Sequence, residues 1–134
     1  MLRALGRRYT LALVTSGNRR RVLSQLRRFG LRNKFAACVF AEDAARRKPH
    51  PAPLRLALDR LALPPELCIY VGDAPEDVQM ARRAGVRTIG FLGPFPTHRR
   101  LRASKPMAIV KSLKKLPLIL NSLGRQKEVR KPGN

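Results

Sequence analysis

Short apolar runs alternate with segments of helical periodicity along nearly the whole chain, and this alternation constrains the fold more than any other feature. The first run, 9–15, leads into a Ser-Gly turn, and Asn18 follows as a helix cap. Val22, Leu26 and Phe29 then recur at helical spacing. The pattern predicts further strands at 35–40, 67–71, 86–92 and 107–110, helices at 19–29, 53–62 and 75–84, and a last helix carrying Leu113, Leu116, Leu120 and Leu123.

The expected strands are continuous apolar runs and do not alternate with polar residues. Such strands are buried on both faces, which is typical of a parallel sheet covered by helices on each side. The sequence therefore predicts a three-layer, Rossmann-like α/β fold. At 134 residues the chain has room for one core. We expect a core domain over 1–123 and a basic, flexible tail over 124–134.

The chain is strongly basic, with 29 Lys and Arg against 8 Asp and Glu and a formal net charge of +21. Residues 1–48 hold 13 basic and 2 acidic side chains, and residues 99–134 hold 11 and 1, around a neutral middle. These flanks fit solvated helix faces, but they also favour polyanions. A protein that binds nucleic acid non-specifically therefore stays open as an alternative, although no helix-turn-helix, zinc or ribonucleoprotein motif occurs.

The sequence also bears on location. No apolar run approaches the roughly 20 residues that a membrane-spanning helix needs, so we expect no membrane partner. The N-terminal region is rich in arginine like a transit peptide, but its apolar residues are needed for the first strand, so we expect no cleavage. Cys38 and Cys68 lie in apolar runs and are interpreted as reduced core residues, which favours a cytoplasmic location.

Polar side chains gather where the expected strands end, and the carboxyl ends of parallel strands form the usual site in such sheets. Thr15 and Ser16 follow the first strand and could hold a phosphate at a helix start, or simply cap the helix. Lys48 follows the second strand and is held by a proline. Asp73 and Asp77 follow the third strand at a spacing that suits Mg²⁺, or a helix cap and dipole.

Together these three segments resemble the haloacid dehalogenase superfamily, and its phosphoglycolate phosphatase-like branch in particular. The resemblance covers residues 2 to 123 and is carried by Leu-Ala-Leu-Val-Thr-Ser at 11–16, Lys-Pro-His-Pro at 48–51 and Tyr-Val-Gly-Asp-Ala-Pro-Glu-Asp at 70–77. It implies a phosphatase that acts on small phosphorylated metabolites through an aspartyl-phosphate. In that mechanism Thr15 and Ser16 bind the phosphoryl group and Lys48 neutralises its charge. Asp73 ligates Mg²⁺, and Asp77 supports the metal or orients Lys48.

One departure from the family is serious. The family's first motif, Asp-x-Asp, supplies the nucleophile, and the 134 residues contain no such pair. The helical cap that selects the substrate is missing as well. The chain therefore resembles the C-terminal part of such an enzyme, and we expect it to be inactive alone and to bind Mg²⁺ weakly or not at all. A phosphate-binding or regulatory remnant is the alternative.

The departure also affects the expected sheet. In the superfamily, the first-motif strand lies between the strand that ends at Thr15 and the strand that ends at Asp73. Without it, strands 9–15 and 68–72 must either pair directly or leave two unpaired inner edges. Unpaired edges are costly and invite association. We therefore expect a chain that is marginally stable, molten or self-associating.

Overall fold

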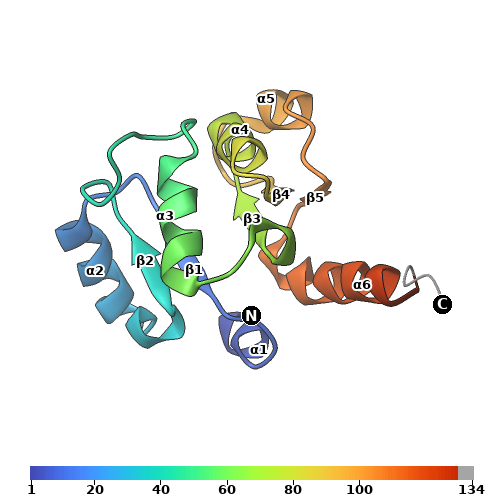
Figure 1. The fold of residues 1–134 in the computed structure, drawn as a ribbon, viewed down its shortest axis with the longest axis horizontal. Helices are drawn as coiled ribbons and strands as arrows, with labels where there is room; N and C mark the ends of the chain where they lie inside the picture. Colours follow the sequence, from blue (N-terminus) through green and yellow to red (C-terminus); the bar gives the residue numbers. More distant parts are fainter. Residues whose placement is uncertain (130–134) are drawn as a thin grey trace.

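The computed structural model describes residues 1–129 (Figure 1). Strands and helices alternate along the chain as the sequence predicts. The strands are β1 (Ala12–Val14), β2 (Ala37–Val39), β3 (Ile69–Gly72), β4 (Arg87–Phe91) and β5 (Ala108–Val110). The α-helices are α1 (Leu2–Gly6), α2 (Arg19–Arg28), α3 (Ala52–Leu61), α4 (Pro75–Arg83), α5 (His98–Ala103) and α6 (Leu116–Val129). Three 3-10 turns lie at Arg32–Lys34, Pro65–Leu67 and Leu113–Lys115.

All the strand pairs are parallel, as expected, but they form two sheets instead of one. β1 pairs with β2, and Leu13 lies opposite Cys38. β3, β4 and β5 form the second sheet, in which Val71 lies opposite Ile89. Among the described residues β1 and β3 do not pair with each other. Of the two outcomes that the sequence left open, the structure therefore has the one with unpaired inner edges.

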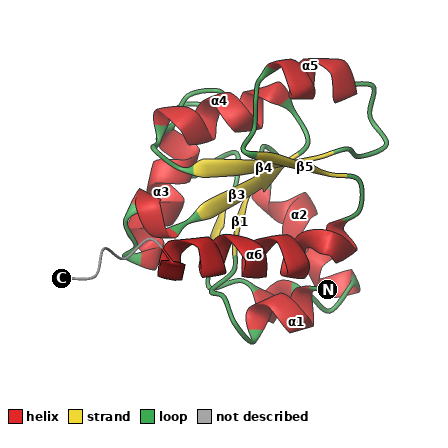
Figure 2. Cartoon of the chain, turned by 90° about the vertical axis from the view of Figure 1, so that its right-hand side faces the viewer, coloured by secondary structure: helices red, strands yellow, loops and turns green. Residues whose placement is uncertain are grey.

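Helices cover both faces of the strands, which confirms the layered α/β fold (Figure 2). Neighbouring residues of β1 show how alternation sends side chains to opposite faces. Leu13 packs with the buried residues of α2, whereas Val14 packs with those of α3 and α4. A third cluster joins Leu5 of α1 and Leu116 of α6 to β4 and β5.

A large, mostly apolar cavity lies where the two sheets fail to meet. Its volume is about 830 Å³, and both β1 and β3 line it. Leu5, Leu116 and Leu120 line it as well, and these three residues also pack in the cluster between α1 and α6. The cavity is therefore bounded by the inner edges of the two sheets and by the helices that cover them.

The structure refines the expected elements mainly at their ends. β1 covers three of the seven residues expected as a strand, and the helices α1 and α5 were not expected at all. Asn18 caps α2 as predicted, since its side chain accepts a hydrogen bond from the N–H of Arg21 at 2.8 Å. Gly30 and Gly85 follow α2 and α4 with φ of 65° and 76°, a conformation that favours glycine.

Two expectations concern the C-terminal region and the thiols. The predicted tail over 124–134 begins inside α6, which continues to Val129, and residues 130–134 lie outside the described part. The domain boundary stays a prediction. Cys38 and Cys68 are free thiols, but each is only partly buried. Burial raises the pKa of both. No helix within residues 1–129 has the length and apolar character to cross a membrane.

Candidate functional site

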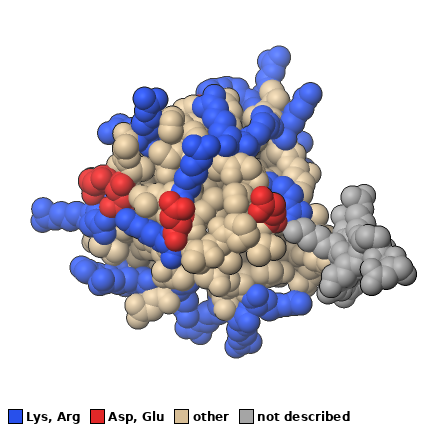
Figure 3. Space-filling view, viewed as in Figure 1, with Lys and Arg blue, Asp and Glu red and all other residues tan. Residues whose placement is uncertain are grey.

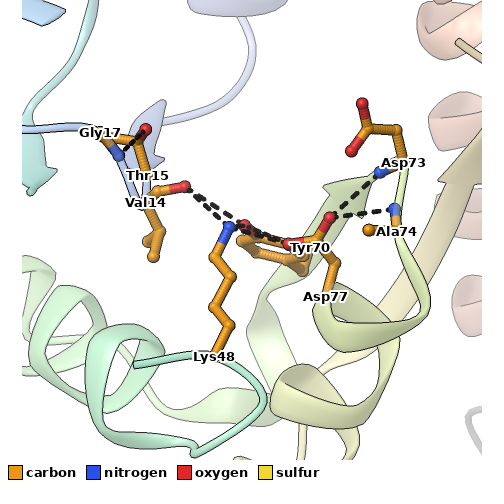
Figure 4. A network of polar contacts seen from close by, with 8 residues as sticks. All are labelled: Val14, Thr15, Gly17, Lys48, Tyr70, Asp73, Ala74 and Asp77. Atoms are coloured by element: carbon orange, nitrogen blue, oxygen red, sulfur yellow. Dashed lines mark hydrogen bonds and ion pairs between the residues drawn. The ribbon is translucent and has the colours of Figure 1, made fainter. Parts of the chain in front are cut away.

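Lys48 lies at the centre of a polar network between the two sheets (Figure 4). Its Nζ donates to Oδ1 of Asp77 at 2.8 Å and to the hydroxyl of Tyr70 at 2.9 Å. A third and longer bond, 3.4 Å, runs to the carbonyl oxygen of Val14. The Tyr70 hydroxyl also lies 3.3 Å from the Val14 carbonyl oxygen. One lysine from the loop after β2 thus joins β1, β3 and α4.

Asp77 is held in place by backbone N–H groups just before the start of its own helix. The carboxylate is buried, and its Oδ2 accepts from the backbone N–H groups of Asp73 and Ala74, both at 3.2 Å. Gly72 makes this geometry possible, because a Cβ there would lie 2.4 Å from the Cβ of Asp77. The carboxylate therefore caps α4 with one oxygen and binds Lys48 with the other.

The network sets the charges of its members. Burial acts to lower the pKa of Lys48, but Tyr70 and Asp77 outweigh it and leave that pKa raised. Burial, helped by the Asp77 charge, raises the pKa of Tyr70 to about 12, although Lys48 opposes the shift. Near neutral pH the site therefore holds a lysinium paired with Asp77 and a neutral tyrosine that hydrogen-bonds to both.

The turn after β1 brings hydroxyl groups to the same place. The N–H of Gly17 donates to Oγ1 of Thr15 at 3.0 Å, which leaves the Thr15 hydroxyl hydrogen free to point elsewhere. A small cavity of about 10 Å³ is lined by Thr15, Ser16 and Lys48, with Arg46 and Arg47 at its side. This volume suits about one water molecule, so an anion as large as phosphate does not fit inside it.

Asp73 stands apart from the Lys48 network. Its backbone N–H and carbonyl are both engaged, the carbonyl by the Thr97 hydroxyl at 3.0 Å. Figure 4 shows its carboxylate without a contact to any residue drawn. Over residues 1–129 there is no group of three or more His, Cys, Asp or Glu side chains that could hold a metal ion. Because Mg²⁺ requires near-octahedral oxygen ligands, and Asp77 is already bonded on both oxygens, these residues do not form a complete site.

The structure thus brings most of the predicted residues together. Lys48 and Asp77 are in contact, and Thr15 and Ser16 share a cavity with Lys48. Asp73 reaches the network only through its backbone N–H. Their functional roles stay predictions. The sequence did not indicate that Tyr70 takes part in this network. A tyrosine in an apolar strand needs a partner for its hydroxyl when it is buried, and this could have indicated it.

Comparison with known proteins places the fold and the site in context. Residues 1–91 match a family described as haloacid dehalogenase-like hydrolase. The chain is 31% identical over 119 residues to a phosphoglycolate phosphatase of Pectobacterium atrosepticum, covering 88% of this chain and 51% of the relative. It is 31% identical over 116 residues to a pyrophosphatase of Bacillus pumilus, covering 87% and 54%. The chain therefore spans about half the length of these curated relatives.

Solved structures give the same result for the fold. CbbY from Rhodobacter sphaeroides, in complex with phosphate, matches with a TM-score of 0.75 and 29% identity over 83% of this chain and 50% of that one. A 2-haloacid dehalogenase from Pseudomonas syringae matches with a TM-score of 0.73 and 32% identity over 91% and 50%. These structures also extend well beyond the part that the chain matches.

Proposed function

Because the chain belongs to the haloacid dehalogenase-like hydrolases, we propose that it is the phosphate-binding part of a phosphatase that acts on small phosphomonoesters. The curated relatives support this reading, since those compared above are a phosphoglycolate phosphatase and a pyrophosphatase. The observation that carries the proposal is the position of Lys48. Its ammonium is fixed at 2.8 Å from a buried carboxylate, and it shares a cavity with the hydroxyl residues Thr15 and Ser16.

Each residue has a distinct part in binding the phosphoryl group. The Thr15 hydroxyl donates to a phosphoryl oxygen, because its own oxygen already accepts from Gly17. The Lys48 ammonium neutralises charge on the group, as cations do in phosphoryl transfer. Its weakest bond, 3.4 Å to Val14, is the one that a phosphoryl oxygen replaces. Tyr70 and Asp77 keep the ammonium charged and fixed in direction.

Turnover needs more than these residues supply. An aspartyl-phosphate mechanism requires a carboxylate that is free to attack phosphorus. Within residues 1–129 Asp77 is bonded on both oxygens, and the carboxylate of Asp73 lies outside the network. The described residues also do not complete a Mg²⁺ site, so the phosphate contacts proposed here are those of the side chains alone. We propose that this chain binds phosphate groups without hydrolysing them, and that a nucleophile from outside these residues is needed for turnover.

Phosphate binding can be tested by calorimetric titration with inorganic phosphate and with phosphoglycolate. A hydrogen bond to a charged group contributes about 1.5–3 kcal/mol. We therefore expect Thr15→Val to weaken binding by about 10- to 150-fold. Thr10→Val is the matched control, since Thr10 is exposed and lies outside the Lys48 network. Equal affinity for the two variants would contradict the role of Thr15.

The absence of turnover is tested separately with p-nitrophenyl phosphate. We expect the unaltered chain to hydrolyse this substrate no faster than the Lys48→Met variant purified in the same way. Hydrolysis that persists through purification and is lost in both Lys48→Met and Asp73→Asn would show that the chain contains a working nucleophile. Such a result would overturn the binding-only proposal while supporting the phosphatase site.

A further inference from the structure

We propose that the start of α3 and the end of α4, with the loops beside them, bind the sugar-phosphate backbone of double-stranded nucleic acid. This surface is called the basic ridge, and its residues are Arg46, Arg55, Arg82, Arg83 and Lys105. All of them are exposed, and they lie outside the Lys48 network. The inference therefore does not rest on the proposed phosphatase function.

A series of hydrogen bonds makes the ridge continuous. Arg83 donates to the carbonyl of Pro49 at 3.0 Å, and Arg55 donates to the carbonyl of Arg83 at 3.4 Å. Arg82 donates to the carbonyls of the two residues that follow α5, at 2.6 and 3.3 Å. These bonds join the loop before α3, the last turn of α4 and the loop after α5 into one surface, although the three segments lie far apart in the sequence.

The ridge arginines are oriented by neutral groups and not by acids. Arg55, Arg82 and Arg83 bond to backbone carbonyls, and among the described side chains no ridge residue forms an ion pair. Other exposed arginines have a carboxylate partner, and these are Arg19, Arg60 and Arg100. A guanidinium has five N–H donors, so a ridge arginine held by one or two bonds keeps both its charge and free donors for a ligand.

The surroundings of His50 show the same excess of positive charge. Burial lowers the pKa of this ring, and the charges of Arg46, Arg55 and Arg83 lower it further, with no carboxylate of the described residues to offset them. The Nδ1 of His50 accepts from the N–H of Ala52 at 3.0 Å, so Nε2 carries the ring hydrogen. Near pH 7 the ring is therefore neutral, and it adds one donor beside the three arginines.

The fold separates charges that are balanced in the sequence. Residues 49–98 hold five basic and five acidic side chains. In α4 the acidic residues Glu76 and Asp77 lie in the first turn, whereas Arg82 and Arg83 lie in the last turn. This order suits the helix dipole. The dipole does not account for the other ridge residues, which reach the same place from segments outside α4.

Acidic side chains are sparse around the ridge. Figure 3 shows Lys and Arg side chains gathered over the upper part of the molecule, where α4 and α5 lie in Figure 1, with no acidic side chain among them. Asp59 lies one turn after Arg55 in α3, but no ion pair joins the two. The positive charge of the ridge is therefore available to an anionic partner.

The residue types of the ridge favour a nucleic acid duplex over other polyanions. Every ridge residue but one is an arginine, whose planar fork matches phosphate oxygens. A membrane surface requires exposed apolar side chains beside the charges, but the apolar neighbours Leu54, Ala81 and Ala84 are buried. Single strands are bound largely by stacking on aromatic rings, and no ridge residue is aromatic. A duplex requires neither, since it presents one phosphate charge per about 1.7 Å.

Binding is measured by fluorescence anisotropy. A labelled DNA duplex of about 20 base pairs is titrated with the full chain, from about 50 to 200 mM NaCl. We expect saturable binding that weakens steeply with salt. Each phosphate contact contributes about −0.9 to the slope of log K against log salt, so three contacts give a slope of at least about −2.7.

Two variants of equal net charge locate the binding. The ridge variant is Arg55→Met/Arg82→Met/Arg83→Met. The control variant is Arg19→Met/Arg60→Met/Arg100→Met, which alters arginines that have a carboxylate partner. We expect the ridge variant to bind at least about tenfold more weakly at the lowest salt and to lose about 2.7 of the slope. The control variant should stay within about threefold of the unaltered chain.

Single variants keep the test decisive if the triple ridge variant does not fold, which circular dichroism detects. Arg82 and Arg100 are both exposed, and each substitution removes one charge. We expect Arg82→Met to reduce the slope by about 0.9 and Arg100→Met to leave it unchanged.

Three results would overturn the proposal. Equal weakening in the ridge and control variants would show that net charge alone attracts DNA. A salt slope near zero would exclude phosphate contacts. Phosphatidylserine vesicles or polyglutamate that bind as tightly as the duplex, and lose binding in the ridge variant, would assign the ridge to a lipid surface or an acidic polypeptide. Thr15→Val should leave duplex binding unchanged, so the failure of phosphate binding at Lys48 and the failure of this inference are distinguishable.

Discussion

Replacing Asp77 with leucine should destabilise the chain far more than the same change at its neighbour Glu76. Both residues lie in the first turn of α4 and both form an ion pair. The environments differ greatly. The Lys48 and Asp77 side chains are 16% and 7% exposed, whereas those of Arg100 and Glu76 are 69% and 43% exposed.

The magnitude follows from the contacts. At 2.8 Å and an effective dielectric constant of about 20, the attraction between Lys48 and Asp77 is about 6 kcal/mol before desolvation is subtracted. Removing one partner of a buried pair costs about 3–5 kcal/mol, because the other charge stays buried. The lost cap on two backbone N–H groups adds about 1 kcal/mol. Glu76→Leu should cost no more than about 1 kcal/mol.

The assay is urea unfolding followed by circular dichroism, on both single variants and on the double variant Lys48→Met/Asp77→Leu. The double variant carries neither charge, so only the cap and the hydrogen bonds are lost. We expect it to be about 2–3 kcal/mol more stable than Asp77→Leu alone. If Asp77→Leu is unfolded in buffer, the double variant should recover a cooperative transition.

Two results would refute this reasoning. A double variant that is less stable than Asp77→Leu would show that the buried lysinium is not penalised when it loses its partner. Equal costs for Asp77→Leu and Glu76→Leu would show that burial does not separate the two pairs. In either case the Lys48–Asp77 pair would behave energetically like an exposed ion pair. The charged state assigned to Lys48 would then not be supported.

Three further predictions concern the site and the gap. In a Tyr9→Phe variant, tyrosinate absorbance should titrate with a midpoint of about 12. Neutral Tyr70 then stabilises the fold below pH 10, and this contribution is lost as the pH rises through about 12, so the urea midpoint should fall over that range. The unaltered chain should have a free energy of unfolding below about 5 kcal/mol, and a monomer with one cooperative transition above that value would contradict the cost assigned to the unpaired edges. Calorimetry should detect no saturable binding of Mg²⁺, and a tight site that disappears in Asp73→Asn would show that the metal ligands are more complete than they look.

The helices and strands were predictable where local pattern and core packing agree. Leu54 and Leu58 recur at helical spacing, and both are buried in α3. Asn18 was predictable as a cap because its side chain bonds within three residues. Helix α5 was not predictable, since its sequence His-Arg-Arg-Leu-Arg-Ala offers only one large apolar residue, Leu101, which is fully buried.

The site was predictable in its composition but not in its connections. The sequence places Lys48 and Asp77 at strand ends, and both meet there. The role of Tyr70 depends on the distance across the gap, and no local pattern contains that distance. The same holds for the split into two sheets, since each strand has an ordinary apolar sequence and only the pairing shows which edge is left open.

The open edge between β1 and β3 also has a consequence for cooperativity. Among the described residues no backbone ladder crosses the middle. The β1-β2 part and the β3-β4-β5 part are joined by two core clusters and by the Lys48 network. In one cluster Leu58 of α3 packs with Met80 of α4, and in the other Leu5 of α1 packs with β4 and β5. Amide hydrogen exchange should therefore reveal two separate opening units, one around β2 and one around β4. If the amides around one of these two strands exchange more slowly than those around the other, the slower part stays folded while the other part opens. The Lys48 network would then be the polar contact that breaks when the two parts separate.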